Sequence, residues 1–464
     1  MKILQPLFLL SVLLLADSAK AQQKLTLKDA IQQAVTNYGT VKAKANYANA
    51  SKAGVTQAKR DYLPNLNIGV QQDYGTVNSQ NGPLYGFGGL TAASSGPALD
   101  RQNWNAAFGA LYLTNVNWDF FAFGRSKEKI KTAQAAAIRD NNDLQQEIFQ
   151  QKVRVSAAYL NLLAAQRLTA SYRNNLNRAD TFRQVVASRA KGGLIAGVDS
   201  SQANAEISGA KILLTQAVDA EQLQAKNLAV LIGTDGHDFV LDTSFIVQVP
   251  PHIMAATTPD GINNHPLLNW YKSRIDVSDR LAAYYKTFNY PVFSLVGVFQ
   301  TRGSGFNSGY ALDQTAYTSS YADGIKPTRS NYLIGVGVTW NLTQPLRISQ
   351  QVKSQKYISQ GLQDEYDQTK LELNAQLNLS NSRIKNALSN YREVPIQIKA
   401  ASDAWTQKSV LYKNGLSNLV DVTQARYALI RAETDRDIAY NNVWQALLLK
   451  AAAEGDFNLF LNEL

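Results

Sequence analysis

The chain contains nearly the same thirteen residues twice. The stretch KGGLIAGVDSSQA, which begins at Lys191, recurs as KNGLSNLVDVTQA from Lys413, with seven identities at a shift of 222. The same shift pairs Trp118 with Trp340, and a shift of 227 pairs Pro64 with Pro291. A period near 220 residues is far longer than the roughly 20 to 50 residues of solenoid modules. The duplication therefore predicts one structural unit used twice, with two-fold pseudo-symmetry within a single chain.

This repeat sets the expected domain organisation. Residues 1–21 are predicted to be a secretory signal, since Lys2 precedes an apolar run that ends before Ala19-Lys20-Ala21. The first repeat is expected at 22–232, a linker at 233–261, and the second repeat at 262–464. Each repeat should contain a helix, two strands, a long helix and a further helix, and the second repeat should add a short tail.

The longest helices are predicted from stretches that lack helix breakers. Residues 126–191 contain no Gly and no Pro, which corresponds to about 100 Å of helix at about 1.5 Å per residue. The counterpart at 347–413 contains Gly361 and Pro395, so we expect an interruption there, with a kink or bulge near the proline. Shorter helices are predicted over Leu27 to about Arg60, 197–232 and 419–455. Helices of this length cannot be buried in one compact domain.

Four strands are predicted at about 65–72, 106–121, 291–300 and 331–342, each with alternating side chains. In the last strand one face is apolar and the other is small and polar. A half-buried strand of a soluble sandwich alternates in this way, and so does a strand of about 9 to 11 residues that spans lipid. The strand alone does not decide between them, but the helix lengths favour the membrane. The expected lipid-facing residues are Tyr332, Ile334, Val336, Val338 and Trp340.

Four membrane strands cannot stand alone, because an open edge in hydrocarbon leaves backbone groups without hydrogen-bond partners. The strands must therefore pair with strands of other copies. Two copies would give eight strands and three would give twelve, and a conduit favours three or more because eight-stranded barrels are filled by side chains. The sequence does not choose the number.

Composition argues against most chemistry. The chain has no cysteine, which excludes disulfides, thiol catalysis, cysteine-bound metals and a lipid anchor on cysteine. The three histidines have no metal-ligand spacing, and no catalytic triad, phosphate loop or paired carboxylates stand out. We therefore expect no enzyme activity, no metal and no cofactor. The net charge of +10 is spread among many polar residues, so no nucleic-acid partner is expected.

Taken together, the signal, the duplicated units, Leu63-Pro64 before a strand and the repeated Lys-x-Gly-Leu-x-x-x-Val-Asp-x-x-Gln-Ala make the chain resemble the TolC-like outer membrane efflux protein family. The resemblance implies a mostly α-helical homotrimer in the Gram-negative outer membrane, with a shared 12-stranded β-barrel and a long periplasmic helical barrel. It also implies a passive conduit for tripartite efflux or type I secretion, opened by a periplasmic adaptor and an inner-membrane RND or ABC pump. The alternative is a soluble periplasmic coiled-coil scaffold or adaptor.

The repeated motif lies where a long helix ends and the next helix begins, so its two copies are expected to be the tips of two helical hairpins. Glycine should supply each turn, and the aspartate that follows should cap the returning helix. The adaptor is expected to meet these tips, which comprise Lys191, Gly193, Leu194 and Val198 in the first repeat and Lys413, Gly415, Leu416 and Val420 in the second.

The resemblance also implies a periplasmic gate at the second tip. Asp421 matches a family aspartate that would form an acidic ring in a trimer, and Tyr412 matches a gate-linking tyrosine. Asp199 is the first-repeat counterpart of Asp421. Where relatives carry a second aspartate this chain has Gln424, and where they carry an arginine it has Ser417, so we expect a lock that is weaker or differently built.

Overall fold

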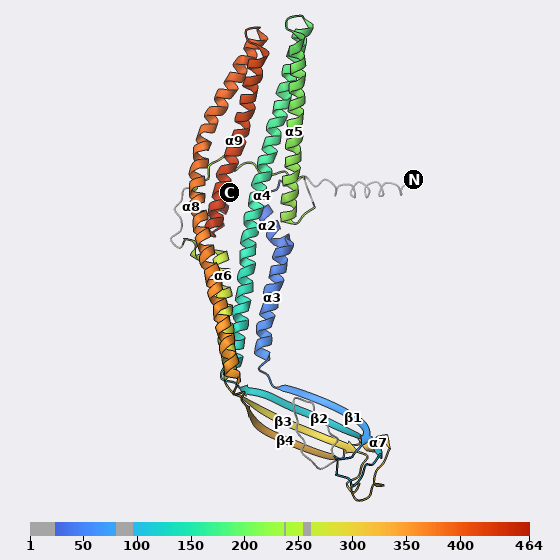
Figure 1. Cartoon of the computed structure of the whole chain (residues 1–464). Helices are drawn as coiled ribbons and strands as arrows, with labels where there is room; N and C mark the ends of the chain where they lie inside the picture. Colours follow the sequence, from blue (N-terminus) through green and yellow to red (C-terminus); the bar gives the residue numbers. More distant parts are fainter. Residues whose placement is uncertain (1–23, 80–95, 236–237, 254–260) are drawn as a thin grey trace, which may run out of the picture. The chain divides into compact units, whose positions relative to one another are not determined.

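The computed structural model describes residues 24–79, 96–235, 238–253 and 261–464. The predicted signal at 1–21 lies outside the described residues, and so do parts of the first glycine-rich loop and of the linker. The described chain is mostly helical with one small sheet (Figure 1).

Two compact units form, and each takes segments from both repeats. The helical unit contains the described residues up to Ser51 together with Ala136–Asp276 and Gln360–Leu464. The sheet unit contains Lys52–Ala135 and Val277–Ser359. Each of the two longest helices begins in the sheet unit and ends in the helical unit, so the units do not coincide with the repeats.

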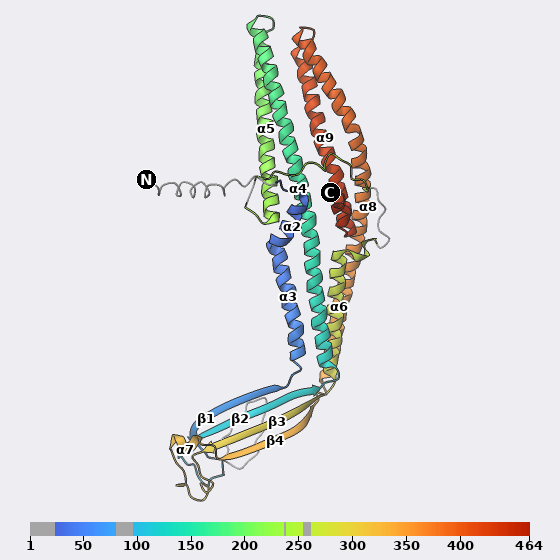
Figure 2. The same cartoon turned by 180° about the vertical axis from the view of Figure 1, so that it is seen from behind.

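The sheet has four antiparallel strands in the order β1-β2-β3-β4, as both views show (Figures 1 and 2). The strands are β1 (Asn65–Thr76), β2 (Ala106–Phe121), β3 (Val292–Ser304) and β4 (Arg329–Thr339). All four overlap the predicted strands, and β1 and β3 continue four residues further. Pairing of β2 with β3 joins the two repeats, and β1 and β4 are the sheet edges.

The two longest helices are α4 (Arg125–Lys191, 67 residues) and α8 (Gln344–Lys413, 70 residues). The long helix predicted at 347–413 is present as α8, which Gly361 and Pro395 do not end, and the kink or bulge near Pro395 stays a prediction. Proline removes a single helical hydrogen bond, and Pro395 is exposed, so water can satisfy the carbonyl that loses its partner. The returning helices are α5 (Gly197–Ile232) and α9 (Leu419–Glu454). No described helix has an apolar stretch long enough to cross a membrane.

The opening helix, expected to be continuous from Leu27 to about Arg60, is divided into α2 (Leu27–Asn37) and α3 (Gly39–Arg60). Tyr38 between them has an extended backbone. The second repeat breaks at the equivalent place, where η2 (Gly261–Asn264) precedes α6 (Pro266–Lys286) and His265 separates the two. A shift of 227 pairs Tyr38 with His265. The break is thus a shared feature of the repeat that helical periodicity alone does not predict.

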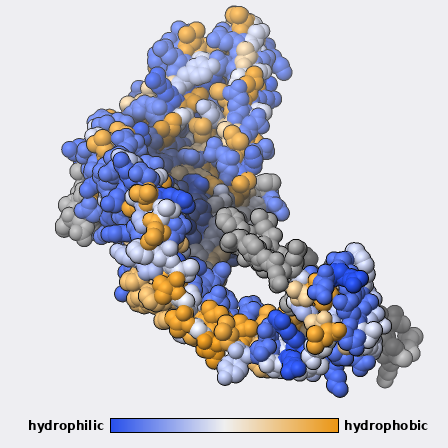
Figure 3. Space-filling model, turned by 60° about the horizontal axis from the view of Figure 1, so that its bottom comes forward, coloured by the Kyte–Doolittle hydropathy of each residue, from blue (hydrophilic) through white to orange (hydrophobic). Residues whose placement is uncertain are grey.

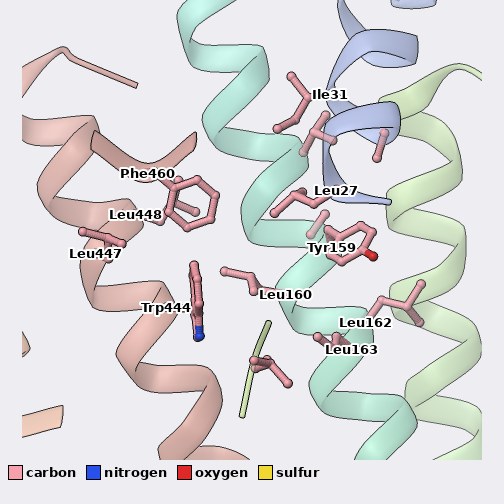
Figure 4. Packing of buried hydrophobic residues seen from close by; sticks show 14 of the residues in the cluster. Leu27, Ile31, Tyr159, Leu160, Leu162, Leu163, Trp444, Leu447, Leu448 and Phe460 are labelled. Carbon is pink, nitrogen blue, oxygen red and sulfur yellow. The ribbon is translucent and has the colours of Figure 1, made fainter. Parts of the chain in front are cut away.

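The remaining short elements are η3 (Thr287–Asn289), α7 (Tyr321–Ile325) and α10 (Asn458–Leu461). The main core lies in the helical unit, where α4 and α9 pack with α2, α5 and the C-terminal α10. Its largest buried side chains include Tyr159, Leu160, Trp444 and Phe460 (Figure 4). Both repeats supply this core, which locks the two hairpins together.

Candidate functional site

The first candidate surface is the apolar face of the sheet. Cross-strand partners share a face, and the register places Ile334 of β4 beside Gly297, Gly297 beside Val116, and Val116 beside Leu66 of β1. An apolar surface therefore runs across all four strands, and apolar side chains gather along the sheet in Figure 3. The five predicted lipid-facing residues lie on this face and are 56 to 78% exposed. They are Tyr332, Ile334, Val336, Val338 and Trp340.

The opposite face, which we term the polar face, carries most of the polar side chains of the four strands. Asn67 Nδ2 donates to Asn115 Oδ1 at 2.9 Å, and Ser294 Oγ donates to Asp119 Oδ1 at 2.5 Å. In β4 this face carries Leu333, two glycines and Thr339. Strands β2 and β3 add further apolar members to it, namely Leu111, Leu113, Val292, Val296 and Val298. A sheet with one apolar face and one face rich in polar side chains suits a boundary between lipid and water.

The duplicated tryptophans hold both halves of the sheet in the same way. Trp118 Nε1 donates to the carbonyl of Tyr62 at 2.8 Å, and Trp340 Nε1 donates to the carbonyl of Asn289 at 3.1 Å. The donors are related by the shift of 222 and the acceptors by the shift of 227. Amphipathic indole rings of this kind are typical of the edge of a membrane.

The second candidate surface is the pair of hairpin tips. Gly193 and Gly415 have φ values of 70° and 76°, a region that glycine enters without the penalty a Cβ would bring. Their neighbours Leu194 and Leu416 donate back to the carbonyls of Arg189 and Leu411 at 3.0 and 2.9 Å. Both helices thus end with the glycine turn expected from the sequence.

Apolar side chains at the two tips face solvent. Leu194 and Val198 are 71% and 69% exposed, and Leu416 and Val420 are 73% and 61% exposed. Lys191 and Lys413 end the two long helices beside them and are exposed as well. Each tip therefore presents one basic and two apolar side chains.

The returning helix of the second tip is capped by a residue that the sequence did not single out. Asn418 Oδ1 accepts from the backbone N–H of Asp421 at 2.9 Å. The Asp421 carboxylate, which was expected to cap, instead accepts from Lys408 Nζ at 3.0 Å and Ser417 Oγ at 3.2 Å. These two hydrogen bonds lower the pKa of Asp421. In the first tip the cap position is Ala196, which offers no side-chain bond, and Asp199 likewise caps nothing there.

Tyr412 links the tips of the two hairpins. Its ring is 2% exposed and packs on Phe182 of α4 at 5.2 Å, and Arg189 Nη1 donates to its carbonyl. Burial raises the pKa of Tyr412, and Asp199 adds to the rise while Arg189 opposes it. Asp199 and Tyr412 are thus brought together, whereas Asp421 pairs within its own hairpin and Gln424 is exposed. Arg189 and Lys408 were missed, because only packing shows which cations reach these groups.

Further along the hairpins, an ion pair and a buried hydrogen bond join helices of the two repeats. Arg178 of α4 makes two hydrogen bonds to Glu433 of α9, at 3.0 and 2.6 Å. Ser171 donates to Asp437 at 2.9 Å, although Asp437 is only 3% exposed. Removing the Ser171 hydroxyl would take a hydrogen bond from a carboxylate that is almost fully buried, which is costly because the group is shielded from water. The hairpins are therefore held in one register.

Comparison with known proteins agrees with this geometry. Residues 30–234 match the model of the family described as outer membrane efflux protein. The expected resemblance to that family is confirmed. The match covers most of the first repeat, and the family description places its members in the outer membrane. The Gram-negative outer membrane is accordingly the location indicated for this chain. No curated protein sequence matches the chain.

Solved structures described as an outer membrane protein, an outer membrane channel and a transmembrane channel share the fold over nearly the whole chain. VceC of Vibrio cholerae has a TM-score of 0.70 at 14% identity, covering 93% of this chain and 96% of its own. CmeC of Campylobacter jejuni has a TM-score of 0.70 at 13% identity, covering 92% and 85%. CusC has a TM-score of 0.72 at 13% identity, covering 93% and 92%. Both repeats thus share the fold, including the part beyond residue 234.

Proposed function

We propose that the chain is one subunit of a homotrimeric outer-membrane exit channel, a passive conduit for an efflux or type I secretion system. The observation that carries the proposal is the sheet with one apolar face across all four strands and a second face that carries most of the polar side chains. It supports a lipid-facing outside and a water-facing inside. A soluble scaffold has no use for such a sheet.

The two edge strands of the sheet must pair with strands of other subunits if the sheet lies in lipid. Strands β1 and β4 each have one unpaired side in the described chain, and unsatisfied backbone groups cost several kcal/mol apiece in hydrocarbon. Three copies would provide twelve strands, enough for a barrel with an open lumen. The pairing between repeats, β2 with β3, is the natural guide to the pairing between subunits, β4 with β1.

The β2–β3 pairing predicts which residues of β4 and β1 pair between subunits. Asn115 pairs with Val298 within the chain, and the shifts of 222 and 227 carry this pair to Gly337 of one subunit and Gln71 of the next. Both residues lie on the polar face, as a correct register requires. A shift by one residue would place a polar side chain in lipid.

Disulfide formation tests this proposal directly, because the native chain has no cysteine. We expect Gln71→Cys with Gly337→Cys to form an oxidant-dependent trimer in native outer membranes. The matched control, Asn67→Cys with Gly337→Cys, moves one thiol four residues along β1, about 13 Å away, and should not cross-link. Chains that stay monomeric and soluble without detergent would rule out the channel.

We further propose that the hairpin tips form the periplasmic gate and the docking surface for an adaptor. Three copies of Asp421 around one axis would bind cations at the constriction. In bilayer recordings, Asp421→Ala should raise conductance or relieve divalent block, and Asp199→Ala should do so less. Cysteines at Leu194 and Leu416 should cross-link to the adaptor hairpin. Unchanged conductance and block would remove Asp421 from the gate.

A further inference from the structure

The positive charge of the chain is concentrated at one end of the sheet. The helical segments of the sheet unit, 52–61, 122–135, 277–290 and 343–359, hold twelve Lys and Arg but only three Asp and Glu. This excess of nine is nearly the whole formal charge of +10. The expectation of a charge spread over the chain was therefore wrong.

All four strand ends at this side of the sheet carry an exposed cation. Arg60 lies before β1, Lys127 after β2, Lys286 before β3 and Arg347 after β4, each within eight residues of its strand. With Lys59 they form what we term the basic collar. Among the described residues, none of the five has a carboxylate within 4.0 Å, whereas the neighbouring Lys129 and Lys131 are paired with Asp61 and Glu128.

The other end of the sheet is electrically balanced. Residues 73–105 and 300–330, which contain the loops there, hold four Lys and Arg and four Asp and Glu. The excess is thus specific to the end where the strands meet the long helices.

An open cavity of about 640 Å³ lies within the collar at the end of β2. Lys59 and Lys127 line it together with Tyr62, Phe120 and Phe121. Arg125, also in its wall, stacks on Phe288 at 4.3 Å, and its buried Nε has no hydrogen-bond partner among the described atoms. The cavity combines apolar walls with cations, which suits an amphiphile with an anionic head.

We propose that the basic collar binds the phosphate groups of anionic phospholipids in the leaflet on this side of the membrane. The inference rests on the proposed function, since the apolar sheet face would hold the acyl chains beside the collar. Lysine and arginine next to a membrane attract anionic lipid, and their long side chains reach the headgroup level while their methylenes stay in contact with apolar groups. The bound class would be a glycerophospholipid with net negative charge, such as phosphatidylglycerol.

Competitive reconstitution tests the proposal. The purified full chain is offered two vesicle populations with different dyes, one of phosphatidylcholine and one with about a third phosphatidylglycerol. We expect enrichment of at least about tenfold in the anionic vesicles, reduced by high salt because the charges are exposed. The variant with Lys59, Lys127, Lys286 and Arg347 all changed to Gln should lose the enrichment.

Two variants complete the design. Changing Lys211, Lys226, Lys385 and Lys399 to Gln removes the same charge from exposed sites in the helical unit, and the enrichment should persist. Exchanging Lys for Arg and Arg for Lys in the collar should also preserve it, which separates charge from misfolding. Equal entry of the native chain into both populations, or full enrichment of the collar variant, would overturn the proposal. Failure to enter either population would overturn the proposed channel as well.

Discussion

The two hairpin tips began as copies of one sequence and have kept the turn but not the polar groups around it. Both glycines have positive φ, and both following leucines bond back to the long helix. Only the second tip has a side-chain cap, Asn418, and a lysine on its aspartate. In the first tip, Arg189 instead donates a hydrogen bond to the carbonyl of Tyr412 in the second tip. The backbone turn is therefore the same in both tips, whereas the polar contacts differ and are concentrated on the second tip.

Removing the crossing contact should have the largest effect. Arg189→Met leaves the Tyr412 carbonyl without its cationic donor and should lower the unfolding free energy by about 2 kcal/mol. Leu411 occupies the equivalent position in the second tip and makes no such bond, so Leu411→Met is the matched control. Chemical denaturation in detergent measures both. Equal losses would mean that the tips are not linked through Arg189.

The shared turn should respond equally in both tips. Gly193→Ala and Gly415→Ala each place a Cβ at positive φ, and each should cost about 1 to 2 kcal/mol. The added Cβ would meet nothing within 4 Å at Gly193 and only Arg189 Nη2 at 3.6 Å at Gly415. A clear difference in the same denaturation experiment would contradict the conservation of the turn.

The N-cap residues of the two returning helices can be exchanged, since a shift of 222 relates Ala196 to Asn418. Asn418→Ala should lose about 1 kcal/mol, and Ala196→Asn should gain a similar amount by supplying the missing acceptor. Hydrogen exchange of the Asp421 and Asp199 amides would locate both effects. If Ala196→Asn leaves the Asp199 amide unprotected, the two turns differ in backbone geometry.

The smallest effect concerns proton binding at the second tip. Lys408 and Ser417 lower the pKa of Asp421, so the carboxylate stays charged further into acid than an ordinary aspartate. Its contribution is present above the unfolded-state pKa near 3.9 and is lost as pH falls through the lowered value. Lys408→Met should move the titration of Asp421 upward in a carbon-detected NMR experiment. The reference is the titration of Asp421 in the native chain under the same conditions.

Local sequence signals predict most of the helices and strands, whereas the contacts between them depend on packing. The limits of β2 and α5 follow from alternation and from the Gly at each end of the helix. The break at Tyr38 does not, because helical spacing continues on both sides of it. Arg189 reaches Tyr412 across 223 positions of sequence, and a single sequence carries no mark of such a pair. The same holds for the basic collar, whose members are scattered along the chain and gather only when the strand ends meet.

The pairing of β2 with β3 also has a consequence for the order of folding. It joins Gly109–Phe121 to Phe293–Ser304, so the ladder closes a loop of well over 150 residues, which includes a complete helical hairpin. Distant pairings form slowly, because the entropy of closing the loop is lost before any contact repays it. The β1–β2 hairpin can therefore form long before β3 pairs with it. Until β3 arrives, the apolar side chains of β1 and β2 stay exposed to water in the first half of the chain.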